Sequence, residues 1–237
     1  MDHPRGLVVK EVLRVAGAAA RPVGASVVGH LRVALSAVAA MALFVVVASA
    51  LATLPASAAR TPRATVSQNV EPPFGRSLEG RMATLFADIN RGSLTSAARL
   101  YFPESAYVAM KTGRIPSPAT DYRDRLAAFY RLDLLAYHDY IRADGPATFL
   151  GINASATDAQ WIRPGWCENS IGYWHVAGVR LVYRQGRVVR SVGVASLISW
   201  RGVWYVVHLG PNPRPRDVGT VDSPAQGRGV AGPAGGC

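Results

Sequence analysis

Four polar side chains in the last third of the chain have residue types suited to acid–base chemistry. Tyr173 and His175 stand two positions apart in one alternating run, and Ser196 and Tyr205 lie in the two runs that follow. A histidine can carry protons near neutral pH, and a tyrosine hydroxyl can donate a hydrogen bond to a developing oxyanion. They are candidates for a small-molecule pocket if the fold brings them together.

The segments around these residues have the period of two that is typical of strands. After residue 146 apolar and polar residues alternate between turn signals. Strands are therefore expected at about 147–152, 156–162, 171–184, 187–200 and 203–209.

Two hairpin turns then set the register of the candidate residues. Gln185-Gly186 and Arg201-Gly202 read as two-residue connections. In that register Tyr173, His175, Ser196 and Tyr205 fall in one small patch, since His175 faces Ser196 and Tyr173 faces Ile198, which faces Tyr205. The patch also has an ordinary structural explanation, because tyrosine is a good strand former and no carboxylate partner is fixed by spacing.

The opposite face of these strands is predicted to be apolar at one end and basic at the other. His208 is expected on it, near Trp174 and Leu197, and Arg180, Arg184 and Arg187 mark its basic end. Such a face suits a partner protein or an anionic lipid. A partly covered sheet with a solvated, charged end explains the pattern equally.

Helical periodicity dominates the segment before these strands. Leu78, Met82, Leu85, Phe86 and Ile89 fall on one helical face, a short helix is expected after Ser93 and stops at Pro103, and a longer one runs from about Asp121 to Gly145-Pro146. Three helices followed by an antiparallel meander predict an α+β domain with helices packed on one face of a curved sheet.

An uncharged stretch near the start of the chain predicts a membrane segment. Val33–Leu54 is 22 residues of almost unbroken apolar sequence, about 33 Å as a helix and long enough to span a bilayer. Ala56-Ser57-Ala58 also resembles a signal-peptidase site, so cleavage near Ala58 and secretion is the alternative. The basic flank orients the N-terminus toward the cytoplasm in either case.

These features divide the chain into five parts. Residues 1–32 are a basic cytoplasmic leader, 33–54 the transmembrane helix or signal segment, and 55–76 a linker. Residues 77–210 form the patterned domain, and 211–237 read as a disordered Pro/Gly-rich tail.

The composition argues against a nucleic-acid-binding protein and against a metalloprotein. The formal net charge is +11, but the basic residues are dispersed, with no nucleic-acid-binding motif. The five histidines are also dispersed, so neither a metal site nor a cofactor is expected. Cys167 and Cys237 are the only cysteines. Export would allow a disulfide between them, an intermolecular bridge or a free thiol.

The order of three helices and a long antiparallel meander over 77–210 resembles the nuclear-transport-factor-2-like superfamily, which includes SnoaL-like and ketosteroid-isomerase-like proteins. A single anchor before such a domain is similar to Mce-associated membrane proteins. The resemblance implies a cone that serves as an enzyme pocket or as a binding module.

Two hypotheses follow from these observations. The preferred one is an envelope protein, anchored through Val33–Leu54, whose non-catalytic domain binds a protein, a lipid or a second copy of the chain. The alternative is an isomerase or dehydratase that uses His175 with Tyr173 or Tyr205.

Overall fold

The computed structural model describes residues 67–233, which lie within the compact unit Ala59–Cys237. The leader, the segment Val33–Leu54, the candidate cleavage site near Ala58 and Cys237 lie outside the described residues. Among residues 67–233 no helix is both long enough and apolar enough to cross a membrane.

The helices precede the sheet, as the sequence predicts, and the fold is α+β. Helix α1 (Arg76–Arg91) ends at Gly92, whose φ of 63° is the left-handed conformation that glycine adopts without penalty. The short helices α2 (Leu94–Ala97) and η1 (Ala98–Leu100) follow, and the long helix α5 (Ala127–Arg142) comes last.

Two features of the helical part were not predicted. Helix α3 (Glu104–Met110) begins directly after Pro103, and its two turns are too short for a periodic signal. The third predicted helix has an irregular start, because α4 (Pro118–Asp121) continues into a π-helical turn, η2 (Tyr122–Leu126), before α5. Isolated π turns are rare and are frequent at functional sites.

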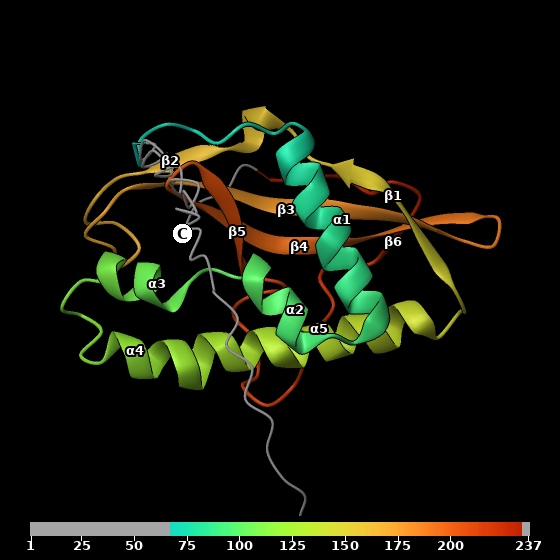
Figure 1. Ribbon diagram of the computed structural model, residues 1–237, viewed down its shortest axis with the longest axis horizontal. Coiled ribbons are helices and arrows are strands. Elements are labelled where there is room, and N and C mark those ends of the chain that lie inside the picture. The colour runs from blue at the N-terminus through green and yellow to red at the C-terminus, as the bar shows by residue number, and fades with distance from the viewer. Residues whose placement is uncertain (1–66, 234–237) are drawn as a thin grey trace, which may run out of the picture. The chain divides into compact units, whose positions relative to one another are not determined.

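A six-stranded antiparallel sheet forms the second half of the domain. Its main path is β1 (Ala147–Asn153), β3 (Tyr173–Gln185), β4 (Val188–Trp200) and β5 (Val203–His208). The short strands β2 (Gln160–Ile162) and β6 (Ala225–Gln226) pair with β3 and β4. Figure 1 shows α1 crossing the sheet and α5 running along its lower side.

The predicted register of the first hairpin is wrong by two residues. Gln185 pairs with Val188, so the turn is Gly186-Arg187 rather than Gln185-Gly186. Gly186 has a φ of 55°, which a hairpin turn requires at its first central position. A slip of two residues keeps every side chain on its predicted face, because side chains alternate with a period of two.

Helices and the C-terminal segment cover opposite faces of the sheet. Phe86 of α1 packs on Tyr183 of β3, with ring centroids 5.4 Å apart. Arg180 lies three residues before Tyr183 in β3. Because side chains alternate between the two faces along a strand, Arg180 points to the other face. There it is 3% exposed and donates to Ser191 and to the carbonyl of Ser223. Arg180 is therefore covered and does not belong to an exposed basic end.

The disordered tail predicted for 211–237 is corrected over its described part. Backbone N–H groups of Gly210 and Thr220 donate to Asp133 of α5, and Arg214 makes an ion pair with the same carboxylate. Strand β6 then pairs with β4 beyond the end of β5. Proline and glycine content misled the prediction, because this segment is held by hydrogen bonds to the domain rather than by its own apolar residues.

The predicted linker also has an ordered end. Residues 67–75 run along the hairpin of β4 and β5, where Gln68 bonds the carbonyl of Ser199 and the backbone N–H of Arg201. The indole of Trp204 donates to the carbonyl of Pro72. The folded domain therefore begins before α1.

Candidate functional site

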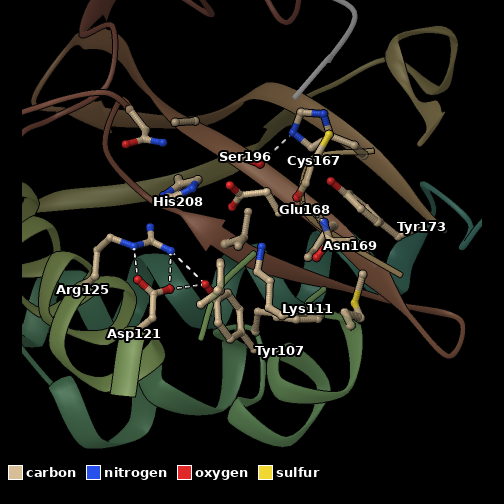
Figure 2. A pocket seen from close by; sticks show the side chains of 18 of the residues that line it. Tyr107, Lys111, Asp121, Arg125, Cys167, Glu168, Asn169, Tyr173, Ser196 and His208 are labelled. Carbon is tan, nitrogen blue, oxygen red and sulfur yellow. Dashed lines mark hydrogen bonds and ion pairs between the residues drawn. The ribbon is translucent and has the colours of Figure 1, made fainter. Parts of the chain in front are cut away.

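A cavity of about 590 Å³ opens between the strands and helices α3 and α4. This volume lies in the range of small-molecule sites, about 300–1,000 Å³. Figure 2 shows side chains from the sheet, from the segment 167–169 and from both helices converging on it. Its apolar wall consists of Phe102, Met110, Ile115, Ile198 and Val207.

Three of the four predicted residues lie in the cavity wall. Tyr173 and His175 come from β3, and Ser196 comes from β4. His175 Nε2 lies 2.7 Å from Ser196 Oγ. His175 pairs across the sheet with Ile198 rather than with Ser196, so the two side chains meet diagonally on one face.

Tyr205 lies outside this cavity. It pairs with Ile198, as predicted, but its ring stacks under the guanidinium of Arg81 at 4.7 Å. Its other neighbour is Phe102, whose ring centroid is 6.1 Å away. Phe102 itself lines the cavity, so the tyrosine sits behind that wall.

A β-bulge adds a histidine that the sequence places on the opposite face. Leu197 pairs with Val206, but Ser196 pairs with His208, so one extra residue is inserted in β5. Val207 and His208 both line the cavity as a result. Burial, together with the charges of Arg125 and Arg214, lowers the pKa of His208 to about 4. The His208 ring is therefore neutral at physiological pH.

The π-helical turn positions an ion pair at the base of the cavity. Arg125 donates through Nε and Nη2 to the two carboxylate oxygens of Asp121, each at 2.7 Å. Tyr107 of α3 donates its hydroxyl to Asp121 as well. The hydrogen bonds from Arg125 lower the pKa of Asp121, and burial raises that of Tyr107. Within this network the positive charge of Arg125 balances the negative charge of Asp121.

Lys111 is different, because its ammonium has no such partner. It follows α3 directly, and its backbone forms a bridge with Asn169. Its Nζ lies 4.8 Å from the centroid of the Tyr107 ring and makes no hydrogen bond or ion pair with residues 67–233. Figure 2 shows this ammonium pointing into the cavity. Burial lowers the pKa of Lys111, although the nearby carboxylate of Glu168 opposes the effect.

A strained turn forms the rim of the cavity beside Lys111. Cys167 and Glu168 have φ angles of 52° and 60°, a conformation that non-glycine residues rarely adopt. Thr112 donates its backbone N–H to the carbonyl of Glu168 at 2.9 Å, which holds the turn against the end of α3. Cys167 is disulfide-bonded. The predicted pairing with Cys237 stays a prediction, because Cys237 lies outside the described residues.

Tyr173 completes the wall as a hydrogen-bond donor. Its side chain is 6% exposed, and burial raises its pKa to about 12. The hydroxyl therefore keeps its proton throughout the physiological range. The cavity as a whole offers the ammonium of Lys111, the neutral ring of His208 and a tyrosine hydroxyl beside an apolar wall, and the carboxylates of Asp121 and Glu168 also line it.

Sequence reasoning missed Lys111 and Arg125, and it placed His208 on the wrong face of the sheet. A lysine is unusual here, since Lys10 and Lys111 are the only lysines among 26 basic residues. That rarity was the one signal that pointed to Lys111. Arg125 and His208 depend on a π turn and on a bulge, which the pattern of apolar residues does not reveal.

Comparisons with protein-family models, curated proteins and solved structures find no match for this chain. Within residues 67–233 no group of three or more His, Cys, Asp or Glu side chains is placed to hold a metal ion.

Proposed function

We propose that the domain binds a small organic molecule with a carboxylate-like anionic group in the cavity beside Lys111. The observation that carries this proposal is the ammonium of Lys111, which faces the cavity without an ion pair to a described residue. A partly buried cation is costly until an anion compensates it. A bound carboxylate supplies that compensation.

The rest of the cavity supports the same class of ligand. Tyr173 is positioned to donate to a ligand oxygen, and Asn169 adds a buried amide. The apolar residues of the opposite wall, with Ile198 and Phe102 among them, suit a hydrocarbon body. Most of the remaining lining is polar, so the cavity suits a small ligand that carries polar groups as well as a short hydrocarbon body.

A ligand panel tests the proposal on the fragment 59–237, which contains the whole described core. Monocarboxylates of six to ten carbons are compared with their matched amides by thermal shift and calorimetry. At a ligand concentration of 100 Kd, binding stabilises the fold by about 2.7 kcal/mol, or about 5–10 °C for a domain of this size. Equal shifts from acids and amides would refute the ligand class.

Variants then locate the site. Lys111→Gln is expected to weaken carboxylate binding by about ten- to a hundred-fold, the loss typical of a charge-assisted hydrogen bond. Arg114→Gln is the matched control, because it removes the same charge from an exposed position outside the cavity wall. A similar loss in both variants would point to net charge rather than to the cavity.

The setting of the domain is also a proposal. We infer that the chain is a cell-envelope protein with this domain outside the cytoplasm, anchored by Val33–Leu54 or released by cleavage near Ala58. The disulfide at Cys167 supports export, since disulfides persist mainly in oxidising compartments. A phosphatase fusion at residue 59 that is inactive in cells would contradict this location.

We also propose that the domain is a nuclear-transport-factor-2-like cone. Helices that precede an antiparallel sheet, with a cavity between the two, support a nuclear-transport-factor-2-like cone. An experimental structure whose sheet does not wrap the cavity would reject it.

A second candidate function is favoured by the histidine–serine contact. His175 Nε2 lies 2.7 Å from Ser196 Oγ within the cavity, and Tyr173 lies in the same wall as a protonated donor. Such a set suits proton abstraction beside a carbonyl, as in an isomerase or dehydratase. Deuterium uptake at that carbon of a bound keto acid, lost in His175→Gln and kept in Arg114→Gln, tests the candidate. No uptake in the unmodified protein would reject it.

A further inference from the structure

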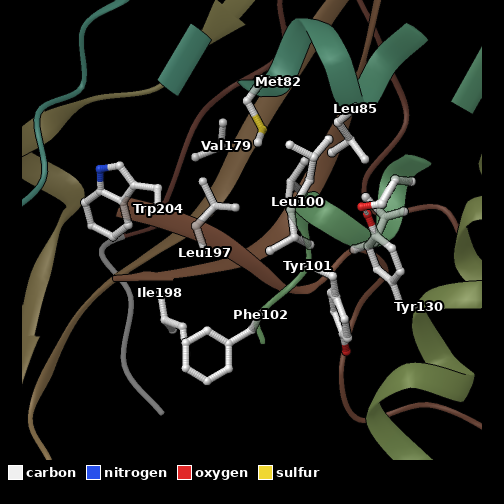
Figure 3. Close-up of a cluster of buried hydrophobic side chains, with 14 of the residues drawn as sticks. Met82, Leu85, Leu100, Tyr101, Phe102, Tyr130, Val179, Leu197, Ile198 and Trp204 are labelled. Atoms are coloured by element: carbon white, nitrogen blue, oxygen red, sulfur yellow. Dashed lines mark hydrogen bonds between the residues drawn. The ribbon is translucent and has the colours of Figure 1, made fainter. Parts of the chain in front are cut away.

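A second hollow, separate from the cavity, lies between α1 and the segment α2–η1. It has a volume of about 470 Å³. The apolar side of α1 is turned elsewhere, because Figure 3 shows Met82 and Leu85 directed into the core beside Leu100. We call this hollow the arginine groove, and it is lined by Arg76, Ser77, Gly80, Arg81, Thr84, Ser96, Arg99 and Leu100.

The arginine groove has three positive side chains and no acidic one in its lining. Among residues 67–233, none of these arginines forms an ion pair, whereas Arg91, Arg123, Arg125, Arg190 and Arg214 do. The acidic residues of α1 are either directed away from the groove or paired with another side chain. Glu79 lies over Gly151 of β1, and the buried Asp88 is paired with Arg91 and accepts from Ser96.

Arg81 is held rigidly at the inner side of the groove. Its Nε donates to the carbonyl of Trp204 at 2.9 Å, and its guanidinium lies over the Tyr205 ring. Nη2 is buried and has no hydrogen-bond partner among the described residues. Nη2 itself is out of reach of a ligand, but the charge of the guanidinium has no ion-pair partner among the described residues, and an anion in the groove compensates it.

The start of α1 adds to the positive potential. Arg76 and Ser77 belong to its first turn, and the N-cap Gly75 provides no side-chain cap. The side chains of Arg76 and Ser77 make no hydrogen bond with residues 67–233. A helix N-terminus carries partial positive charge, so this turn adds to the positive potential of the groove, although Glu79 also belongs to it.

We propose that the arginine groove binds the phosphate group of an anionic phospholipid. A phosphate offers several acceptor oxygens in the geometry that arginine side chains match. The lipid source rests on the proposed membrane setting, since residues 55–66 join the ordered segment 67–75 to the predicted segment Val33–Leu54 and can extend about 40 Å at most. The phosphate chemistry itself does not depend on that setting.

Vesicle sedimentation of the fragment 59–237 tests the proposal. Phosphatidylcholine vesicles are compared with vesicles that contain 30% phosphatidylglycerol, at about 0.05 and 0.5 M salt. We expect binding to the anionic vesicles alone, and weakening at high salt as charges are screened. The double variant Arg76→Gln with Arg99→Gln is expected to bind at least tenfold more weakly. Because both side chains are surface groups without ion pairs, the fold should persist, and circular dichroism checks it.

A matched double variant separates the groove from net charge. Arg184→Gln with Arg187→Gln removes the same two charges at the exposed end of the β3–β4 hairpin. We expect vesicle binding to stay within about twofold of the unmodified fragment. An equal loss in the two double variants would overturn the groove as the site, and so would a loss confined to the hairpin variant.

Two further experiments distinguish a lipid phosphate from a soluble phosphate, and the arginine groove from the carboxylate cavity. Calorimetry with glycerol 3-phosphate tests soluble phosphate, and binding of it without vesicle binding would overturn the lipid as the source. No binding in either arm would overturn the groove altogether. Lys111→Gln is expected to leave vesicle binding unchanged, so failure of the carboxylate cavity and failure of the groove give different results.

Discussion

The neutral state of His208 makes a quantitative prediction about stability below pH 7. In the folded chain its pKa is lowered to about 4, against 6.5 for an unperturbed histidine. Between these values the unfolded chain binds more protons than the folded one, so acid favours unfolding. The loss works out as about 1.4 kcal/mol at pH 5.5 and about 3 kcal/mol at pH 4, at about 1.36 kcal/mol per pKa unit.

Urea unfolding of the fragment 59–237 at pH 7.5, 5.5 and 4 measures this loss. Other groups also titrate over the range, so the comparison is with His208→Gln, which cannot be protonated there. The unmodified fragment should lose about 3 kcal/mol more than the variant between pH 7.5 and 4. If the two free energies of unfolding stay parallel across the range, His208 is not desolvated as the structure indicates.

Three other changes probe the C-terminal segment and the cysteine. Asp133→Asn leaves the guanidinium of Arg214 buried without its ion pair and should cost about 3–5 kcal/mol in urea unfolding; a cost below 1 kcal/mol would contradict this. Gly193→Ala places a Cβ 1.9 Å from the carboxylate of Asp222 and should speed proteolytic cleavage after residue 210, whereas unchanged cleavage would mean a loose segment. Non-reducing peptide mapping should find Cys167 joined to the other cysteine of the same chain, and a dimer-linking bridge would show the pairing to be intermolecular.

The parts of the fold that could be predicted are those with a clear period. Leu78, Met82 and Leu85 repeat at helical spacing and lie in α1, and the alternation from 171 to 209 places β3, β4 and β5 within two residues of their ends. Helix α3 lacks a repeat, because only two turns are present. The segment 211–233 lacks one as well, since its order comes from polar contacts with residues far away in the sequence.

The candidate site also contains some residues that the sequence could place and others that it could not. Tyr173, His175 and Ser196 could be placed on one face, because a hairpin slip of two residues leaves the faces unchanged. His208 could not, since a single inserted residue in β5 reverses its side. Lys111 reaches the cavity from a loop that the strained turn at Cys167 and Glu168 supports, and no periodic pattern describes such a loop.

The hydrogen bonds of the C-terminal segment have a consequence for the way in which the newly made chain matures. The hydroxyl of Tyr137 receives the backbone N–H of Asp222, and Arg180 finds its carbonyl partner at Ser223. These partners lie 43 or more residues further along the chain than the groups that they satisfy. Until residues 210–223 dock, the carboxylate of Asp133 and the guanidinium of Arg180 lack hydrogen bonds that they make in the native fold, so docking of this segment completes the domain.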